Sequence, residues 1–361
     1  MMRRIATSDL DHVVRHAMPA WERVRGARIL VTGATGFFGS WLLESFAHAN
    51  AELSLGAELV GLVPPDESVP SRSPHLASLD GVSFVKGDVA TLDAGDLRAQ
   101  LTGRGGFGFD LVMHAAIFVD AATYDANPIP TLESGVEGTR RVLDVARAAG
   151  AKRFLLASSG AVYGAQPRDL PLMDEGWLGG PDPASHRAAY GEGKRIAETM
   201  CACYHRAYAF DAMIARCFAF VGPHLPLDRH FAIGNFMRDA LAGGPVVVLG
   251  DGTPLRSWMY AADLAVWLWT ILTSGTPARP YNVGSDVPVS IADAASAVAA
   301  LVTPPASVEI RGSRPAAADA DAAPERYVPS IARARAELGL DLRIPLDDAI
   351  ERTFRWHRSA R

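Results

Sequence analysis

The chain has 361 residues, of which 49% are apolar, and a formal net charge of −5. This length and apolar content are typical of a globular protein that buries a large core in one large domain or two closely joined ones. The mild acidity and the scattered arginines exclude the basic patch that nucleic acids or anionic membranes require, so the composition favours a small-molecule substrate and no nucleic-acid partner.

Residues 1–26 are predicted to form an N-terminal helical extension. They carry charges throughout and lack the apolar core of a signal peptide. The longest apolar stretch, LAVWLWTIL at 264–272, is too short to span a bilayer. We therefore expect a cytoplasmic protein with no membrane partner.

The next stretch, ILVTGATGFFGSWLLESF at 29–46, is an apolar run that is broken by three glycines and resumes with helical periodicity. The glycines, at the point where a strand turns into a helix, are Gly33, Gly36 and Gly39. A tight turn there needs residues without a Cβ, and a dinucleotide pyrophosphate must approach the bare backbone. The first turn of the helix, with Phe37 and Phe38, offers its N–H groups and dipole to the phosphates. This pattern predicts a dinucleotide site, although its spacing is GxxGxxG rather than GxGxxG.

From residue 27 to about 220, short apolar runs alternate with amphipathic stretches. Such alternation is the pattern of βαβ units and predicts an α/β fold, a Rossmann-type doubly wound parallel sheet. Beyond about 221 the pattern loosens into loops with proline and glycine, which indicates a smaller second lobe. We expect 27–220 with about 246–272 to form the NAD-binding Rossmann domain, and about 221–245 with 273–361 to form a C-terminal α/β substrate-binding lobe.

The end of the second predicted strand, GLVPPDES at 61–68, bears on the choice between NAD and NADP. The acid expected at the adenosine ribose is displaced here to Asp66, with Glu67 beside it, and no arginine in this stretch precedes Arg72. Acidic groups accept a hydrogen bond from the ribose 2′-hydroxyl and repel a 2′-phosphate. We therefore predict NAD as the cofactor, with NADP as the alternative.

The stretch SHRAAYGEGKRIAETM, 185–200, places Tyr190 and Lys194 four residues apart on a predicted helix, and therefore on one face. A phenol has a reference pKa of about 10, and lowering that pKa to about 7 takes roughly 4 kcal/mol. A nearby ammonium supplies that kind of field. Because the chain uses arginine almost throughout, a lysine one turn after a tyrosine indicates that a compact charge is needed. An ordinary surface Tyr and Lys is the alternative, and the glycine motif makes it the poorer one.

Three cysteines, Cys201, Cys203 and Cys217, are an odd number without a disulfide framework, and we expect them to stay reduced. Cys201 and His205 share a helix face, but two ligands without further ones do not make a zinc site. We expect no metal.

The glycine turn, the segment LLASSGAVYG at 155–164 and the Tyr–Lys pair together resemble the extended short-chain dehydrogenase/reductases of the NAD-dependent epimerase/dehydratase kind, which modify nucleotide-sugars. The resemblance extends from about residue 29 to the C-terminal RTFRWH. It implies that Ser159, with Ser158 as the alternative, bonds the substrate oxygen that is oxidised or reduced. It also implies that Tyr190 is the acid/base, and that Lys194 holds the nicotinamide ribose and lowers the tyrosine pKa.

The same resemblance implies further contacts to the cofactor. Asp88 and the adjacent Val89, in KGDV, would contact the adenine side. The HAA segment, which consists of His114, Ala115 and Ala116, would line the pyrophosphate.

For the substrate, the resemblance implies a nucleoside diphosphate-sugar whose diphosphate is held by Asn235 and Arg256. An arginine fork suits this role because it binds two phosphate oxygens at once. We add Arg326 as a further candidate. The loop VGPHLPLDRHF supplies three more, His224, Arg229 and His230.

The chain departs from the family pattern at four positions. Nucleotide-sugar 4,6-dehydratases carry an acidic pair, and UDP-glucuronate decarboxylases a glutamate, where this chain has Gly160 and Ala161. Elimination of water needs a second acid/base, so dehydratase chemistry is disfavoured. Ala219 and Gly135 replace two asparagines of the pattern, so the substrate cannot be copied from the best-known members.

These features predict an NAD-dependent nucleotide-sugar epimerase with tightly bound NAD, acting at C4 through a transient keto-sugar. The alternative is an NAD(P)H-dependent nucleotide 4-keto-sugar reductase that uses the same residues. A 4,6-dehydratase and a non-catalytic dinucleotide-binding protein are further alternatives. The helices predicted at 131–150 and 188–208 have apolar positions on more than one face, and the resemblance favours a homodimer in which they pair with their copies.

Overall fold

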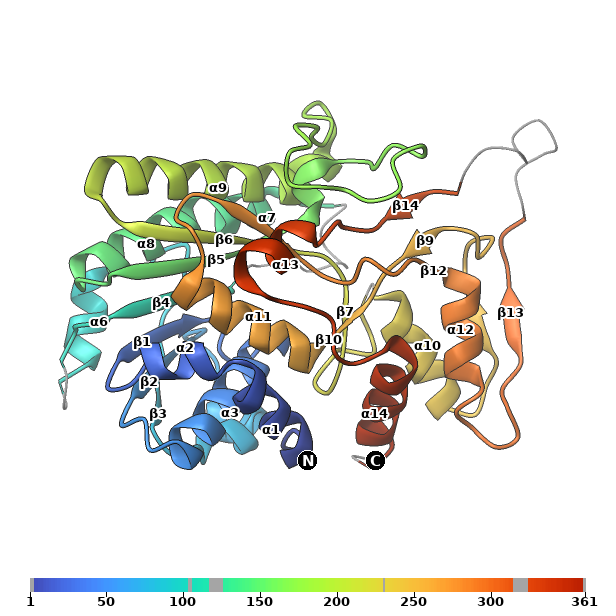
Figure 1. Ribbon diagram of the computed structural model, residues 1–361, viewed down its shortest axis with the longest axis horizontal. Helices are drawn as coiled ribbons and strands as arrows, with labels where there is room; N and C mark the ends of the chain where they lie inside the picture. The colour runs from blue at the N-terminus through green and yellow to red at the C-terminus, as the bar shows by residue number, and fades with distance from the viewer. Residues whose placement is uncertain (1–2, 103–105, 117–125, 230, 314–323, 360–361) are drawn as a thin grey trace.

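A computed structural model describes residues 3–102, 106–116, 126–229, 231–313 and 324–359. Its centre is a sheet of seven parallel strands in the order β3-β2-β1-β4-β5-β6-β11 (Figure 1). The strands are β1 (Arg28–Thr32), β2 (Glu58–Val63), β3 (Val82–Lys86), β4 (Leu111–His114), β5 (Arg153–Ser159), β6 (Asp211–Cys217) and β11 (Pro280–Val283). The order reverses direction between β1 and β4, and open α/β sheets bind ligands at that point. The predicted doubly wound parallel sheet is confirmed.

Both faces of the sheet are buried, because successive strand residues enter opposite cores. In β1, Ile29 and Val31 belong to one buried cluster and Leu30 belongs to the other. The first cluster includes residues of α1 (Thr7–His16), α2 (Met18–Arg23), α3 (Phe37–Glu52) and α11 (Ala261–Ser274). The second includes residues of α6 (Ala94–Gln100), α8 (Thr139–Ala148) and α9 (Ala189–Tyr208). The helix pair α7 (Ile129–Glu133) and η1 (Ser134–Gly138) leads directly into α8.

The rest of the chain forms short sheets and helices beside the carboxyl ends of the strands. The small pairings are β7 (Phe220–Val221) with β10 (Met259–Tyr260), β8 (Val246–Val248) with β13 (Val308–Ile310), and β9 (Leu255–Arg256) between β12 (Val289–Ser290) and β14 (Arg326–Tyr327). The helices here are α10 (Ala232–Leu241), α12 (Ile291–Ala299), α13 (Ala332–Leu338) and α14 (Leu346–Arg358), and two short ones, α4 (Val69–Arg72) and α5 (Pro74–Ala77), follow β2.

The strand pairing differs from the predicted division of the chain in two places. The division puts β11 in the smaller lobe, but β11 pairs with β6 in the large sheet. It puts β8 and β9 with the large sheet, but they pair with strands that follow residue 288. Strand order depends on contacts between distant segments, which local composition does not encode. The division into two domains otherwise stays a prediction.

The N-terminal segment is tied firmly to the core. The buried carboxylate of Asp9 in α1 accepts hydrogen bonds from the Tyr260 hydroxyl and the Arg352 guanidinium, both at 2.6 Å. The indole N–H of Trp356 in α14 donates to the backbone carbonyl of Arg4 at 3.0 Å. The two ends of the chain therefore lie side by side, as Figure 1 shows.

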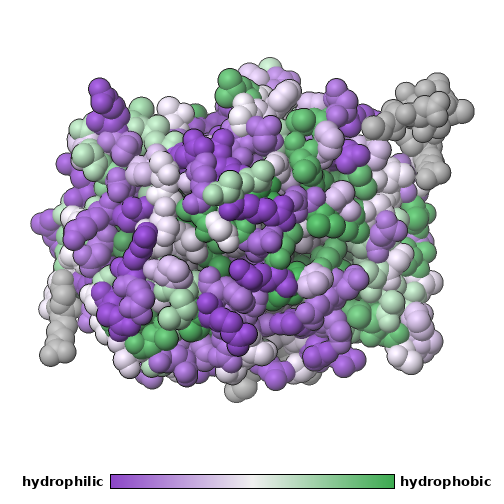
Figure 2. All heavy atoms as spheres, in the orientation of Figure 1, coloured by the Kyte–Doolittle hydropathy of each residue, from purple (hydrophilic) through white to green (hydrophobic). Residues whose placement is uncertain are grey.

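Among the described residues, no helix has both the length and the apolar content needed to cross a membrane. Figure 2 shows hydrophilic and hydrophobic residues interspersed over one face of the molecule.

Candidate active site

The turn from β1 to α3 brings backbone segments very close together. Gly33 has a left-handed backbone, with φ +70°, and a Cβ there would lie 2.9 Å from the backbone nitrogen of Ala116 after β4. A Cβ at Gly39 would lie 2.2 Å from the carbonyl oxygen of Gly33. Side chains at these two positions would force α3 away from the strands, so the glycines set the spacing of strand, loop and helix.

The first turn of α3 is left open for an anion. Gly36 is the N-cap residue, and no side chain caps the helix. The N–H groups of an uncapped first turn, here at Phe37 and Phe38, need acceptors, and phosphate oxygens satisfy them at the positive end of the helix dipole. This geometry fits the pyrophosphate of a dinucleotide.

His114 holds the ends of two strands together. Thr32 and His114 are register partners in β1 and β4, and the Thr32 hydroxyl lies 2.8 Å from Nδ1 of His114. The same hydroxyl accepts the backbone N–H of Ala116 at 3.1 Å. Burial, with a smaller contribution from the Lys194 charge, lowers the pKa of His114 to about 3, so the ring is neutral. We interpret His114 as a positioning residue, while the partly exposed Ala115 and Ala116 lie beside the glycine turn.

At the expected adenosine end, β2 stops at Val63 and two prolines follow. Asp66 is exposed and Glu67 is buried. The ammonium of Lys86, at the end of β3, donates to the carbonyl of Pro65 at 3.0 Å. This basic group beside the loop is a feature that the sequence analysis did not consider.

Asp88 and Val89 lie in the turn after β3. The Asp88 carboxylate accepts the backbone N–H of Ala90 at 2.9 Å and is exposed. Val89 packs against the helix opposite, since a Cβ at Gly138 would lie 3.2 Å from its Cγ2. Their predicted contacts to the cofactor stay predictions.

The two serines at the end of β5 have different partners. Ser158 donates to the buried carboxylate of Glu198 at 2.6 Å, and Arg216 pairs with that carboxylate at 2.7 Å. Ser159 caps the short helix η2 (Gly160–Tyr163) by accepting the N–H of Ala161 at 3.1 Å, and its side chain is close enough to Tyr327 to act on the pKa of that phenol. Because Ser158 is committed to a buried ion pair, the geometry favours Ser159 as the substrate-facing hydroxyl.

Helix α9 brings Tyr190 and Lys194 to the same region. After the turn η3 (His186–Ala188), the helix packs closely on η2, because a Cβ at Gly191 would lie 2.8 Å from the carbonyl oxygen of Ala161. Tyr190 is half-buried. The buried ammonium of Lys194 donates to the carbonyl of Ala157 at 2.6 Å. Burial lowers its pKa to about 8.

Tyr327 is the residue at this site that the sequence analysis missed. A Cβ at Gly160 would lie 2.6 Å from its hydroxyl oxygen and 2.8 Å from the ring of Phe218. Burial, and after it the nearby Tyr190, raises the pKa of Tyr327 well above its usual value, while the hydrogen bond to Ser159 lowers it. Tyr327 follows Arg326 directly, but nothing in the local sequence marks it, because its neighbours come from β5 and α9.

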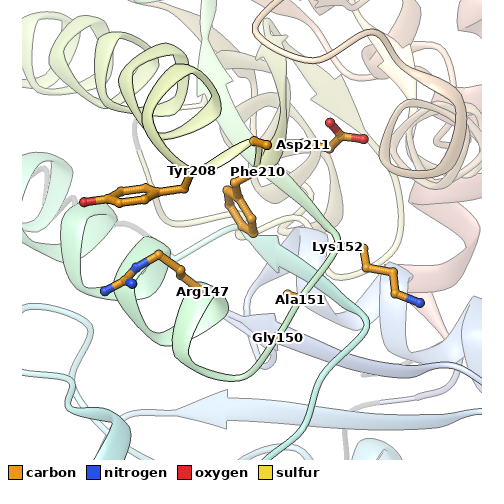
Figure 3. A pocket seen from close by; sticks show the side chains of 8 residues that line it. Arg147, Gly150, Ala151, Lys152, Tyr208, Phe210 and Asp211 are labelled. Carbon is orange, nitrogen blue, oxygen red and sulfur yellow. The ribbon is translucent and has the colours of Figure 1, made fainter.

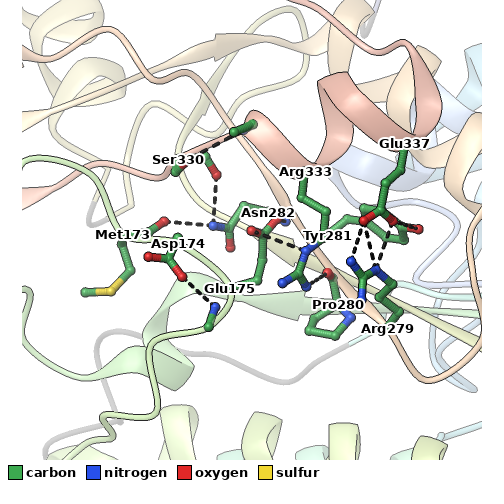
Figure 4. A network of polar contacts seen from close by, with 12 residues as sticks. Met173, Asp174, Glu175, Arg279, Pro280, Tyr281, Asn282, Ser330, Arg333 and Glu337 are labelled. Atoms are coloured by element: carbon green, nitrogen blue, oxygen red, sulfur yellow. Dashed lines mark hydrogen bonds and ion pairs between the residues drawn. The ribbon is translucent and has the colours of Figure 1, made fainter.

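A buried polar network anchors the segment that carries Tyr327 (Figure 4). The side-chain amide of Asn282 donates to the carbonyls of Met173 and Ser330, and its backbone N–H donates to Glu175. The Asn282 carbonyl oxygen accepts the hydroxyl of Tyr163 at 2.7 Å. The loop at 173–175, β11 and the chain after β14 are thereby fixed to one another.

Arginines from the small sheet flank Tyr327. Arg256 in β9 is the register partner of Tyr327 in β14, and its charge acts on that phenol. Its guanidinium binds the Glu325 carboxylate at 2.7 Å. The Nε of Arg326 is buried and has no hydrogen-bond partner among the described residues. Asn235, half-buried in α10, accepts a hydrogen bond from Arg238 at 3.1 Å.

The polar partner of His224 is in α3 and not in the small sheet that carries Arg256 and Arg326. Its ring is buried and lies 3.1 Å from the carboxylate of Glu44 in α3. Its predicted contact with substrate stays a prediction that this placement does not favour. Among the other loop candidates, His230 lies outside the described residues.

A hollow of about 420 Å³ at the opposite edge of the sheet is separate from the site (Figure 3). It is lined by residues at the starts of β5 and β6, and the guanidinium of Arg147 stacks over the ring of Tyr208 at its rim. Ser159 lies at the other end of β5, so this hollow is not part of the same centre.

The first six strands of the large sheet, in Rossmann order with a glycine turn at the switch point, define a dinucleotide-binding fold. Residues 29–284 match the family model described as the NAD dependent epimerase/dehydratase family. The chain therefore belongs to this family, and the resemblance stated from the motifs is confirmed.

Among similar proteins, UDP-glucuronic acid decarboxylase 1 of Arabidopsis thaliana is 30% identical over 90% of this chain and 68% of that protein. UDP-glucuronic acid decarboxylase 3 of the same plant is 32% identical over 90% of this chain and 86% of that protein. Among solved structures, an epimerase from Methanothermobacter thermautotrophicus has a TM-score of 0.74 at 25% identity and covers 95% of both chains. A dTDP-glucose 4,6-dehydratase of Streptomyces venezuelae, solved with NAD and TYD bound, has a TM-score of 0.75 at 26% identity, covering 92% of this chain and 97% of that one.

The lowered pKa of Lys194 predicts a pH-dependent stability. The folded pKa of about 8 lies below the ordinary value of 10.5, so between these values the unfolded chain binds more protons than the folded one. The free energy of unfolding from this group therefore rises as the pH increases from 8 to 10.5, by up to about 3 kcal/mol. Urea unfolding, with no dinucleotide added, gives the free energies of unfolding of the wild type and of Lys194→Met. The difference between these two free energies should grow from pH 8 to pH 10.5. A difference that stays constant from pH 7 to pH 10.5 contradicts the prediction.

Proposed function

We propose that this protein is an NAD-dependent nucleotide-sugar epimerase that acts at C4. Membership of the family, the open first turn of α3 and the grouping of Ser159, Lys194 and Tyr327 support the proposal. NAD complexes among the similar structures support the choice of cofactor.

The cofactor would be held by the backbone of the β1–α3 turn at its pyrophosphate and by Lys194 at its nicotinamide ribose. When bound, NAD accepts a hydride from the sugar carbon and gives it back. The bare glycine turn and the buried ammonium are the parts of this chain that fit such a group.

The chain's own residues handle the proton. Tyr190, as phenolate, would take the hydroxyl proton of C4 while the hydride leaves that carbon, and Ser159 would donate a hydrogen bond to the same oxygen. The buried ammonium of Lys194, one turn further along α9, would stabilise the phenolate. Once the keto-sugar has turned, Tyr190 would give the proton back to the same oxygen as the hydride is returned to the other face of the carbon. Atoms and electrons then balance with no net redox change.

The single observation that carries the proposal is that the Tyr327 hydroxyl fills the space beside Gly160. The Tyr327 hydroxyl lies where a side chain at Gly160 would be, and Ala161 has no ionisable group. The two positions that hold acids in the dehydratase pattern therefore supply no second acid/base here. This favours proton and hydride exchange at one carbinol over elimination of water.

A UDP-glucuronic acid decarboxylase is the second candidate, because proteins of that name are 30–32% identical over about 90% of this chain. Oxidation at C4 makes a uronic acid a β-keto acid, which loses CO₂ readily. The Nε of Arg326, for which the described part of the chain offers no hydrogen-bond partner, is a group that a sugar carboxylate would satisfy. Against this candidate stands Ala161, at the position of the decarboxylases' glutamate.

One incubation separates the candidates. UDP-glucuronate, UDP-glucose and dTDP-glucose are each mixed with purified protein and no added cofactor, and the products are followed by NMR. We expect the C4 epimer of one sugar and no CO₂. Release of CO₂ from UDP-glucuronate establishes the decarboxylase. No turnover of the three sugars, together with turnover of a nucleotide 4-keto-sugar in a second incubation with added NADPH, establishes the reductase.

Tyr190→Phe tests the proton step. The variant keeps the ring but loses the proton-transfer group, so we expect kcat to fall by at least about 10²-fold while the cofactor remains bound. Tyr208→Phe, at the far end of the same helix, is the matched control and should keep wild-type kcat. Near wild-type turnover by Tyr190→Phe would remove the assignment.

Arg256→Ala tests the diphosphate contact. A charge-assisted hydrogen bond is worth about 1.5–3 kcal/mol, so UDP-sugar affinity should fall by roughly 10- to 150-fold. Arg311, which forms an exposed ion pair with Glu309 in the same part of the molecule, gives the control Arg311→Ala. Equal affinities of the two variants, measured by calorimetry, contradict the role of Arg256.

We also propose a homodimer in which α7, α8 and α9 pair with their copies. Exposed apolar side chains on these helices, among them Ile129, Leu132 and Ile196, support it. We expect twice the chain mass in sedimentation at micromolar concentration, and a monomer after Ile129→Asp with Ile196→Asp. A monomeric wild type would refute the dimer.

A further inference from the structure

A buried cluster of two histidines and a glutamate lies on the α3 side of the sheet, apart from the proposed active site. Glu44 is in α3, His75 is in α5, and His224 follows β7. One ligand atom from each lies within 4.8 Å of the other two. We infer that these three side chains bind a divalent transition-metal ion, Zn²⁺ by its ligand preference, as a structural site.

Distances within the cluster suit a metal ion. Oε1 of Glu44 lies 3.1 Å from Nε2 of His224 and 3.7 Å from Nε2 of His75. The two imidazole rings are stacked, with centroids 4.6 Å apart and planes 13° from parallel. Zinc bonds of 2.0–2.2 Å in tetrahedral geometry place neighbouring donor atoms about 3.4 Å apart. The Glu44–His224 distance is near this spacing, and the two rings would turn out of their stacked arrangement to bring all three donors onto one ion.

The surroundings of the His75 ring are the second, independent indication of a metal ion. Its side chain is 2% exposed, yet neither ring nitrogen has a hydrogen-bond partner among the described residues. A buried polar group without a partner costs about 1–3 kcal/mol. A metal ion at Nε2 would satisfy one of these nitrogens, and would do so without any change of fold.

The buried charge of Glu44 also supports a metal ion at this cluster. Its carboxylate is 1% exposed, and its other oxygen, Oε2, accepts the backbone N–H of Ile5 at 2.8 Å, the one hydrogen bond to that oxygen from the described residues. A buried carboxylate needs a compensating cation. The guanidinium of Arg4 is close enough to act on His75, but its hydrogen bonds go to Ser78. A divalent ion on Glu44 gives a site of net charge +1 with two neutral imidazoles.

The position of the cluster explains what such an ion would do. Glu44 holds the N-terminal segment through Ile5, and the ring of Trp356 in α14 packs on His224 at 4.7 Å. The ion would therefore join α3, the segment after β2 and the loop after β7, next to Ile5 and Trp356. This inference does not depend on the proposed reaction.

The test measures metal content and metal spectra of the whole protein. Protein expressed with added Zn²⁺ should hold about one zinc per chain, and His75→Ala and His224→Ala should hold less than a tenth of that. His205→Ala is the matched control, since that imidazole lies on α9 and bonds the carbonyl of Phe210. It should bind zinc like the wild type. Removal of the zinc with a chelator should lower the Tm by several degrees, and added Zn²⁺ should restore it.

Cobalt gives a readout that does not need the alanine variants to fold. Metal-free wild type with Co²⁺ should show visible ligand-field bands, and His75→Cys should add a sulfur-to-metal charge-transfer band. Less than a tenth of a zinc per chain in the wild type, unchanged content in the two histidine variants, or no cobalt bands would each overturn the inference.

Discussion

The close approach of α3 to the ends of β1 and β4 is the constraint on which the rest of the structure depends. Gly33 and Gly39 permit it, because a Cβ at either position would overlap backbone atoms. The hydroxyl of Thr32 then ties His114 and the backbone of Ala116 to the same point. This packing fixes the open first turn of α3 at the switch point of the sheet, and it also sets the direction in which the rest of α3 runs across the core.

Residues from three distant parts of the chain meet at the end of β5. Ser159 comes from the strand, Lys194 comes from α9, and Tyr327 comes from the small sheet. Ser159 is held by its cap of η2, and the helix that carries Lys194 is held by the close contact at Gly191. The segment that carries Tyr327 is held by the hydrogen bonds of Asn282. Since the Tyr327 hydroxyl occupies the space beside Gly160, the C-terminal part of the chain restricts the chemistry that a common fold would otherwise allow.

The similarity to decarboxylases and the residues of the site give different indications of the reaction. Identity near 30% over nine-tenths of the chain reflects the whole fold, most of which is core packing. The reaction depends on a few side chains near one carbon atom, and here positions 160 and 161 carry Gly and Ala. The arginines beside Tyr327 are compatible with a diphosphate or a carboxylate, because both are anions that accept bidentate hydrogen bonds.

The sequence by itself determined the sheet, the glycine turn and the family. These rest on periodicity and on short motifs, which are local properties of the chain. Helical spacing, together with the glycine motif, also predicted Tyr190 and Lys194 as site residues, and their roles stay predictions. Only the tertiary structure decided that Ser158 is bound to Glu198, that β11 joins the large sheet, that Tyr327 closes the space at Gly160, and that His224 faces Glu44. Each of these is a contact between segments far apart in the chain. Their distances are set by how helices and strands pack, and no local pattern of residues records that packing.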